Sequence, residues 1–236
     1  MNAPRSDVVR GAVVVMAKAP REGHVKTRLR GLYSPSEVVD LSECMLRDTL
    51  ALVQALPRVH AAVMCPSQDV TEISARLPAG VHVMGQDGEG LAAGLISVFK
   101  HFVADFRRVI AIDSDSPHLP PAILDSAFAQ LDTNDVVVGP TEDGGYYLVG
   151  ASAVHARLFD SAPLGTCNAF DALRNNARAL GLSVGVTQSW YDVDVPADVS
   201  RLAADLHVEP ARAPRTADFL ASRGRISRTI HGKHTG

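Results

Sequence analysis

Short apolar runs alternate with amphipathic stretches along most of the chain. The run Ala12–Met16 is continuous and rich in β-branched residues, which is typical of a strand covered on both faces. The stretch 89–106 repeats apolar residues at helical spacing, which predicts an amphipathic helix. Further strands are predicted at 59–65, 81–84, 108–112, 135–138, 146–149 and 183–186, and further helices at 34–56, 70–77, 121–131, 170–180, 197–206 and 215–223. This alternation predicts an α/β fold with a mostly parallel sheet and helices on both faces.

One domain accounts for this pattern. The chain has 236 residues, and no repeat, low-complexity block or Pro/Gly-rich linker interrupts the alternation. We expect one domain over residues 1–206, followed by a basic tail at 207–236 with a possible short helix. The tail carries a net charge of +4 within a chain of net charge −3, so the preceding domain is acidic at −7. A solvated tail is the simpler interpretation, and contact with nucleic acid or a partner is the alternative.

Composition narrows the classes of protein. Apolar residues make up 46% of the chain and charged residues 21%, which indicates a globular core. The isoelectric point near 6.3 argues against a nucleic-acid partner. No apolar run approaches the roughly 18 residues of a membrane span, and residues 1–10 lack a signal-type apolar stretch, so we expect a cytoplasmic protein. The three cysteines are widely spaced and fit no zinc or redox motif.

A basic segment follows the first predicted strand. Lys18, Lys26 and Arg28 surround a turn at Gly23. In open α/β sheets the ligand lies beyond the carboxyl ends of the strands, and clustered cations with backbone N–H groups suit a phosphate or diphosphate. Neither the Walker spacing nor G-x-G-x-x-G is present. A solvated basic loop is the alternative.

Two acidic pairs also follow predicted strands. Asp113 and Asp115 follow the predicted strand 108–112 in a D-x-D arrangement. Two carboxylates placed in this way can bind a divalent cation that also binds phosphate oxygens. Acidic residues are also common in turns. Asp192 and Asp194 precede a helix that Pro196 opens, so they either stabilise the helix N-terminus or add metal ligands that face Asp115.

Two glycine-bearing segments complete the candidates. Residues 139–147 combine two adjacent glycines, two acids and two tyrosines, which permit close approach of a ligand and stacking on a ring. A β-turn between two strands is the alternative. Residues 86–90 precede a helix and could contact a base or ribose, or form only a loop.

Together these segments resemble one family. The stretches 16–29, 115–120, 139–150 and 192–198 are similar to the bacterial DUF2064 family of the glycosyltransferase-A (GT-A, nucleotide-diphospho-sugar transferase) superfamily, and the resemblance spans roughly residues 13–206. It implies a Rossmann-like three-layer sandwich that binds a nucleotide at the strand ends. The family usually has an acid where His118 stands, and Asp113 is less usual for it.

The resemblance also implies roles for particular residues. The residues implied for nucleotide binding are Ala17, Lys18, Gly23, Lys26, Thr27, Arg28, Gln86, Gly90 and Leu91. The residues implied for acceptor binding are Asp143, Gly144, Gly145 and Tyr146. The implied ligands of Mg²⁺ or Mn²⁺ are Asp115 and Asp194, with Asp113 and Asp192 as further candidates. The expected catalytic residues are Lys26, Asp115 and Asp143.

Two chemistries fit these residues. A glycosyltransferase would move a sugar from a nucleotide-sugar donor to a small acceptor, and family naming favours this reaction. A nucleotidylyltransferase would join a nucleoside triphosphate to a phosphorylated acceptor, and the segments with Lys26, Arg28 and 143–145 resemble the loops of such guanylyltransferases. A nucleotide-binding protein without catalysis is the non-enzyme alternative. The sequence leaves the oligomeric state open, a homodimer included.

Overall fold

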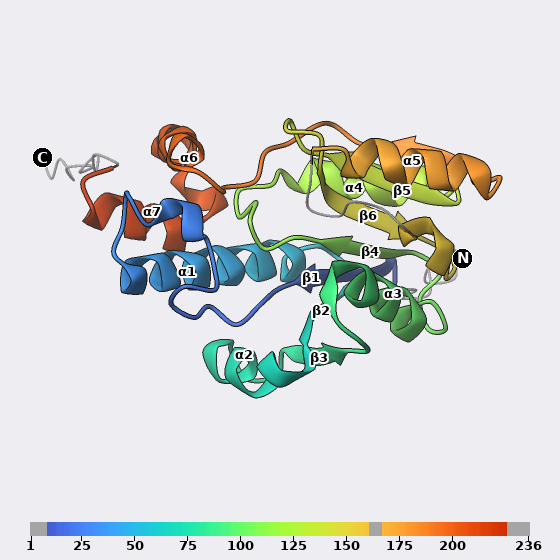
Figure 1. Cartoon of the computed structure of the whole chain (residues 1–236), viewed down its shortest axis with the longest axis horizontal. Helices are drawn as coiled ribbons and strands as arrows, with labels where there is room; N and C mark the ends of the chain where they lie inside the picture. The colour runs from blue at the N-terminus through green and yellow to red at the C-terminus, as the bar shows by residue number, and fades with distance from the viewer. Residues whose placement is uncertain (1–8, 161–166, 226–236) are drawn as a thin grey trace, which may run out of the picture.

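A seven-stranded sheet forms the centre of the molecule in the computed structural model, which describes residues 9–160 and 167–225. The strands are β1 (Gly11–Met16), β2 (Val59–Pro66), β3 (His82–Gln86), β4 (Val109–Ile112), β5 (Val136–Pro140), β6 (Tyr146–Ala151) and β7 (Val184–Val186). Their order is β3-β2-β1-β4-β6-β5-β7 (Figure 1). Strand β6 runs antiparallel to both of its neighbours, and the other pairs are parallel. The predicted mixed, mostly parallel sheet is confirmed.

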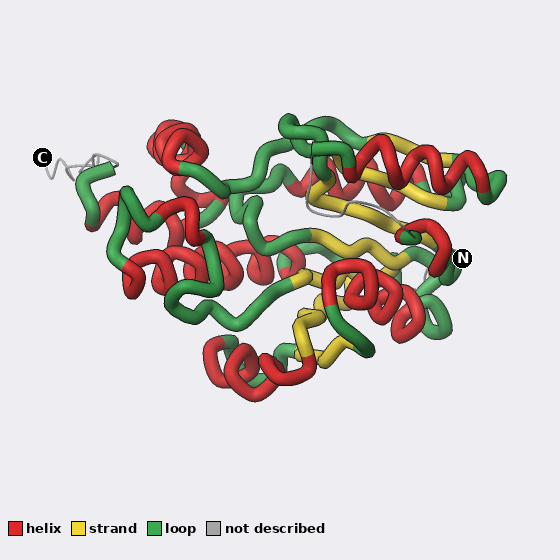
Figure 2. The backbone as a smooth tube through the Cα atoms, viewed as in Figure 1, coloured by secondary structure: helices red, strands yellow, loops and turns green. Residues whose placement is uncertain are grey.

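Helices follow most strands and cover both faces of the sheet. They are α1 (Pro35–Gln54), α2 (Val70–Arg76), α3 (Gly90–Phe102), α4 (Pro121–Gln130), α5 (Ala169–Ala179), α6 (Pro196–Val208) and α7 (Pro214–Ser222). Short 3-10 turns lie at Thr27–Leu29, Ser67–Asp69, Ala156–Phe159 and Pro210–Arg212. Figure 2 shows the helices flanking the central strands. The N-terminus of α1 forms as predicted, because Ser34 and Glu37 cap each other's backbone N–H groups.

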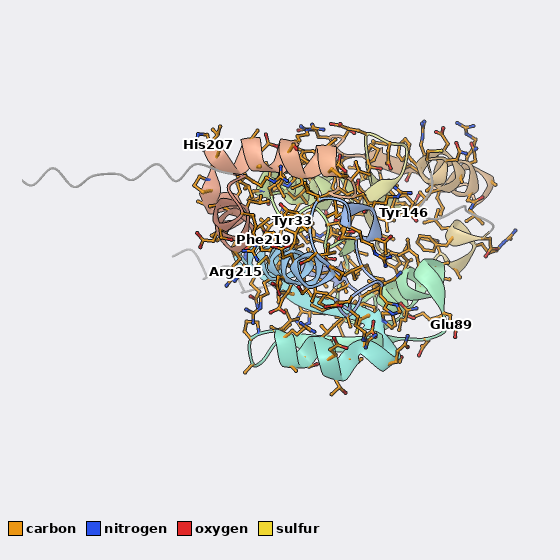
Figure 3. The ribbon with its side chains drawn as sticks, turned by 60° about the vertical axis from the view of Figure 1, so that its left-hand side comes forward. Tyr33, Glu89, Tyr146, His207, Arg215 and Phe219 are labelled. Atoms are coloured by element: carbon orange, nitrogen blue, oxygen red, sulfur yellow. The ribbon has the colours of Figure 1, made fainter. Side chains whose placement is uncertain are left out.

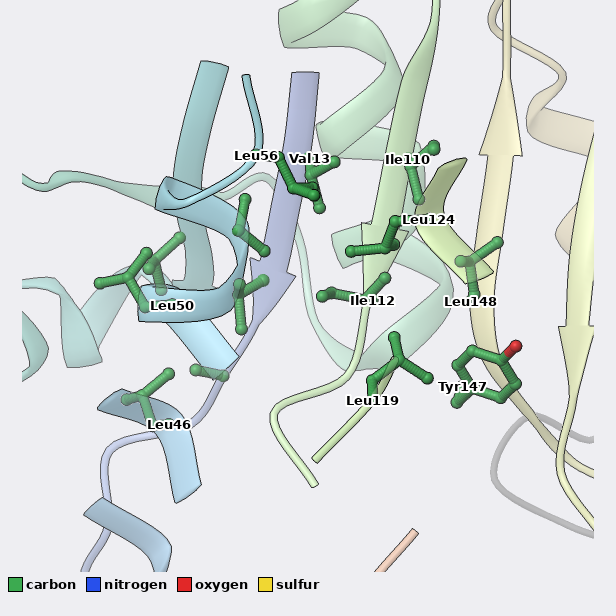
Figure 4. Packing of buried hydrophobic residues seen from close by; sticks show 14 of the residues in the cluster. Val13, Leu46, Leu50, Leu56, Ile110, Ile112, Leu119, Leu124, Tyr147 and Leu148 are labelled. Carbon is green, nitrogen blue, oxygen red and sulfur yellow. The ribbon is translucent and has the colours of Figure 1, made fainter. Parts of the chain in front are cut away.

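Alternate residues of each strand supply two separate cores. On one face Val13 and Val15 of β1 pack with residues of α1, α2 and α4. Figure 4 shows part of this layer, in which Leu46, Leu50 and Leu56 belong to the same cluster as Val13. On the other face Ala12 and Val14 pack with α3 and α5. Side chains of a strand alternate between its faces, so the continuous apolar run of β1 fills both cores. The result is the predicted three-layer sandwich.

A third cluster lies beyond the carboxyl ends of the strands, where α7 packs on α1 and α6 packs on α7 (Figure 1). The carboxylate of Asp48, buried in α1, accepts hydrogen bonds from the backbone N–H and hydroxyl of Thr216, both at 2.8 Å. The rings of Tyr33 and Phe219 meet edge to face at 5.5 Å (Figure 3). The start of α7 is therefore anchored inside the protein.

The basic segment after Leu206 differs from the solvated tail that we expected. Ala213, Ala217 and Leu220 are buried in the third cluster, since α7 has an apolar face that α1 covers. Its cations are also paired internally, as Arg212 with Glu209, Arg215 with Asp48 and Arg223 with Glu37. These pairs leave little unpaired charge for a nucleic acid in the described part of the segment. Arg228 and Lys233, and the N-terminal residues 1–8, lie outside the described residues. Within the described ranges, no helix combines the length and apolar character needed to cross a membrane.

Candidate nucleotide site

A cleft of about 450 Å³ opens at the carboxyl ends of β1, β3 and β4. It is the place where an α/β sheet is expected to bind its ligand. Its lining combines the loop after β1, the acids after β4, the start of α3 and one face of α1. The lining residues are Met16, Ala17, Lys18, Pro20, His24, Val25, Lys26, Ser42, Leu46, Pro66, Gln86, Gly90, Leu91, Asp113, Ser114, Asp115 and Asp194.

Lys26 is the centre of charge in this cleft. Its side chain is only 5% exposed, and its backbone has the left-handed conformation, with φ at 43°. The ammonium lies 2.7 Å from Oδ2 of Asp115 and 2.9 Å from Oδ1 of Asp194. Burial by itself lowers the pKa of Lys26, but the two carboxylates outweigh it and raise the pKa above its ordinary value. The side chain therefore stays charged at neutral pH.

Backbone hydrogen bonds bring the two acidic segments together. The N–H of Val193 donates to the carbonyl of Asp115 at 3.0 Å, which joins the segment after β7 to the one after β4. Asp198 accepts from the N–H groups of Asp194 and Val195 at 2.9 and 2.8 Å, so Asp198 caps α6. The carboxylate of Asp194 is thereby left to face Lys26, and the helix-capping alternative does not account for it.

The other two acids of these pairs are crowded by negative charge. Burial, followed by repulsion from Asp115 and Asp192, raises the pKa of Asp113 well above its usual range. Burial and then Asp194 raise the pKa of Asp192 to about 6. The Oδ1 atom of Asp113 accepts the N–H of Asp115 at 3.0 Å, which shapes the loop. Of these two acids, Asp113 lines the cleft and Asp192 does not.

The carboxylate oxygens of these four acids are the kind of ligand that a hard divalent cation prefers. In the ranges that the structure describes, no three Asp, Glu, His or Cys side chains are grouped around a common metal position. The reason is visible at Lys26, whose ammonium lies between Asp115 and Asp194. The metal-ligand assignment of Asp113, Asp115, Asp192 and Asp194 stays a prediction.

The predicted phosphate-binding residues divide into two groups. Ala17, Lys18 and Lys26 line the cleft, and Lys18 is exposed without an ion pair to any residue of the described ranges. The N–H of Ala17 already donates to Met64, so it is not free for a ligand. The other group, Gly23, Thr27 and Arg28, is absent from the lining. Arg28 is 71% exposed and lies 3.6 Å from Asp194 on the outer side.

The opposite wall is formed by Gln86, Gly90 and Leu91. The amide nitrogen of Gln86 donates to the carbonyls of Gly88 and Gly90 at 3.0 and 3.1 Å, so this side chain holds the turn that leads into α3. Leu91 is 43% exposed, an unusual exposure for a leucine. The cleft thus presents an apolar surface at this wall and cations at the other.

The predicted acceptor residues lie outside this cleft. The Oδ1 atom of Asp143 accepts from the hydroxyl of Thr141 and from the N–H of Gly145, so its carboxylate stabilises the turn between β5 and β6. Gly144 has a φ of 92°, and a Cβ atom there would lie 2.0 Å from the carbonyl oxygen of Cys167. Tyr146 packs against the core below α5. The β-turn alternative accounts for these groups, and their acceptor role stays a prediction.

Several lining residues were not predicted. His24 and Ser114 lie inside segments that the sequence already marked, so their neighbours were the available signal. Ser42 and Leu46 come from the face of α1, and Pro66 ends β2, where no motif points to a ligand.

His118, at the position where the resemblance led us to expect an acid, is fully buried. Its ring packs against Trp190 and Tyr191 at centroid distances of 5.1 and 4.6 Å, and neither nitrogen has a hydrogen-bond partner. Burial lowers the pKa of His118 to about 4, which keeps the ring neutral at physiological pH. This side chain supports the segment after Asp115 by packing.

Comparison with solved structures identifies the class of fold. A crystal structure from Desulfovibrio desulfuricans G20, described as a "putative nucleotide-diphospho-sugar transferase", matches with a TM-score of 0.84 and 24% identity over 92% of this chain and 96% of that one. A CMP:2-keto-3-deoxy-manno-octonic acid synthetase complexed with CTP matches at 0.54 and 13% identity, over 84% and 99% of the two chains. The inositol-1-phosphate CTP transferase of T. maritima matches at 0.55 and 12%, over 90% and 97%. The fold is therefore that of the nucleotide-diphospho-sugar transferases and cytidylyltransferases.

The family is narrower than this class. A model of the DUF2064 family, described as an uncharacterized protein conserved in bacteria, matches residues 49–166, which is half of the chain. The chain belongs to the DUF2064 family. A search of the curated proteins gives no match.

Proposed function

We propose that this protein is a transferase that binds a nucleotide-sugar donor in the cleft and transfers its sugar to a small acceptor. One observation carries the proposal. A buried, charged lysine, held by Asp115 and Asp194, stands at one side of a cleft of about 450 Å³ whose other wall carries the exposed Leu91. With a divalent cation on its carboxylates, the first side suits anionic phosphates, and the second side suits a flat nucleoside.

The chemistry follows from the charge that develops on the donor. In glycosyl transfer the bond between the sugar carbon and the diphosphate oxygen breaks, while the acceptor oxygen bonds to that carbon and gives its proton to water. Negative charge accumulates on the departing nucleoside diphosphate. Lys26 and the unpaired Lys18 are the cleft cations that would stabilise it. Before the donor binds, two carboxylates hold Lys26 in its charged form at the edge of the cleft.

A divalent cation belongs to this proposal. Asp115 and Asp194 would hold Mg²⁺ or Mn²⁺, with Asp113 next to them in the lining. The ion would supply further positive charge to the phosphate oxygens.

Nucleotidylyl transfer is the second candidate. Two of the similar structures are described as using or holding CTP, and both cover more than four fifths of this chain. In that reaction the phosphate of an acceptor attacks the α-phosphate of a nucleoside triphosphate and diphosphate leaves. The same cations serve it, because the departing group is again anionic.

Two measurements test the proposal. Calorimetry of UDP, GDP, CTP and GTP, with and without Mn²⁺, should show metal-dependent binding of at least one nucleotide, and no binding in any condition would overturn it. Incubation with nucleotide sugars or triphosphates and a panel of acceptors separates the reactions. Release of a nucleoside diphosphate supports glycosyl transfer, and release of pyrophosphate that needs a phosphorylated acceptor supports nucleotidylyl transfer. Binding without turnover of any donor supports the non-enzyme alternative.

A further inference from the structure

A buried carboxylate outside the cleft holds the loop that carries its cations. Asp69 lies directly before α2, is 3% exposed and is absent from the cleft lining. Its Oδ2 atom accepts the backbone N–H of Ala19 at 3.0 Å, and its Oδ1 atom accepts from the guanidinium of Arg21 at 2.7 Å. Both oxygens therefore bond to the stretch between Lys18 and Lys26.

Arg21 ties the same loop to a wider network. Its Nε atom donates to Glu72 at 2.7 Å, and Glu72 in turn pairs with Arg76 at 3.0 Å. Arg76 reaches Glu43 of α1 at 2.9 Å. The loop is thus joined through α2 to the long helix α1, which itself packs on the sheet. A loop fixed in this way has lost much of its conformational freedom before any ligand arrives.

The segment that contains Asp69 also holds the opposite wall of the cleft. The hydroxyl of Ser67 donates to the carbonyl of Gln86 at 2.8 Å, and Pro66 lines the cleft directly. A Cβ atom on Gly85 would lie 2.7 Å from Oγ of Ser67, so β3 and this segment are in close contact. Residues 66–69 therefore stand between the two walls and bond to both.

We propose that Asp69 and Arg21 are positioning residues that set the place of the cation loop relative to the wall at Leu91. They do not touch the ligand, but they fix Lys18 and Lys26 where a diphosphate would lie. This inference rests on the proposed function, because it assigns the diphosphate group of the donor to that loop. A misplaced or mobile loop would have to be ordered on binding, which weakens affinity.

The test uses inorganic pyrophosphate with Mn²⁺ present as the probe and calorimetry of the full chain at fixed ionic strength. Two substitutions separate position from charge. Asp69→Asn removes a negative charge near the loop, so simple electrostatics predicts tighter binding of an anion, whereas loss of positioning predicts weaker binding. Arg21→Lys keeps the positive charge but replaces the guanidinium, whose separate Nη1 and Nε atoms reach Asp69 and Glu72, with a single amine on a shorter head group. We expect both variants to bind pyrophosphate about tenfold more weakly.

Glu43→Gln is the matched control. It removes a negative charge from the far end of the same network without any contact to the loop. We expect its pyrophosphate affinity to equal that of the wild type. Melting temperatures of all variants are recorded alongside, and Arg21→Lys keeps the test open if Asp69→Asn fails to fold, because Arg21 is largely at the surface.

The outcomes distinguish this inference from the proposed function. Unchanged or tighter pyrophosphate binding in a folded Asp69→Asn, or unchanged binding in Arg21→Lys, overturns the positioning role alone. A wild-type protein that binds neither pyrophosphate nor any nucleotide overturns the proposed function together with this inference. Equal weakening in Glu43→Gln would assign the effect to general loosening of α2 and also overturns it.

Discussion

Two polar regions of the molecule looked alike in sequence but differ in what their side chains contact. In the cleft, Asp115 and Asp194 converge on Lys26 from separate segments, and all three face the same cavity. In the turn between β5 and β6, Asp143 bonds to residues two positions away on each side. Asp115 and Asp194 therefore remain directed at the cavity, whereas the hydrogen-bonding capacity of Asp143 is used within its own turn.

The largest effect is expected in the cleft. Asp115→Asn leaves the shape of the loop but removes one of the two carboxylates that hold Lys26. Steady-state turnover of whichever donor is active should fall about 100-fold or more, because the proposed divalent cation loses a ligand and Lys26 loses one of the two carboxylates that position it. A folded Asp115→Asn protein with wild-type turnover would remove Asp115 from the site and break the comparison.

The next prediction concerns the backbone of the turn. Gly144→Ala places a Cβ atom against the carbonyl of Cys167 at a φ of 92°, and should lower the free energy of unfolding by about 3 kcal/mol in urea titrations. Gly181→Ala is the control, since Gly181 also has a positive φ but no atom within 4 Å, and should cost about 1 kcal/mol. Equal losses would mean that the contact with Cys167 is not formed.

A third prediction uses the histidine behind the cleft. Burial lowers the pKa of His118 to about 4, and Arg201 and Arg212 act in the same direction while Asp205 opposes them. The unfolded chain takes up this proton near pH 6.5, so native stability should fall as the pH drops from about 6.5 to 4, by up to about 3 kcal/mol.

His118→Phe should remove that part of the acid dependence, because phenylalanine binds no proton. Urea unfolding at pH 7, 6, 5 and 4.5 measures the slope for both proteins. Parallel slopes would show that His118 titrates normally in the native state. The measurement sharpens the comparison, because it separates two causes of lower stability at acid pH. One is protonation of His118 behind the cleft, and the other is protonation of the carboxylates in the cleft.

The smallest effect is expected at Asp143. Asp143→Asn keeps an oxygen that can accept from Thr141 and Gly145, so turnover should stay within about threefold of the wild type. A loss as large as that of Asp115→Asn would place the turn in the catalytic machinery and erase the contrast between the two regions.

The fold could be predicted because its signals are local. The apolar run of β1, the cap at Ser34 and the proline at the start of α6 each act within a few residues. The sheet order of β6 between β4 and β5 did not follow from those signals, since strand pairing depends on contacts between distant segments.

Part of the lining of the cleft was predicted for the same reason. Lys18, Lys26 and Asp115 follow strands, and strand ends meet at one edge of a parallel sheet. Asp69 gave no signal, because an acid before a short helix is ordinary in sequence and only the fold brings it to Ala19. The packing of α7 on α1 was likewise not predicted from the sequence. The basic residues of this segment indicated a solvent-exposed tail, because their carboxylate partners lie far away in the chain.

The anchoring of α7 has a consequence for how the protein is made. Thr216 binds Asp48 across 168 positions of the sequence, and the apolar face of α1 that includes Leu41 and Met45 belongs to the same cluster as α7. On the ribosome, the strands through β7 emerge before that cover does. A nascent chain paused ahead of residue 213 would present this face to chaperones, so a slow codon there would act on yield while leaving the finished cleft unchanged.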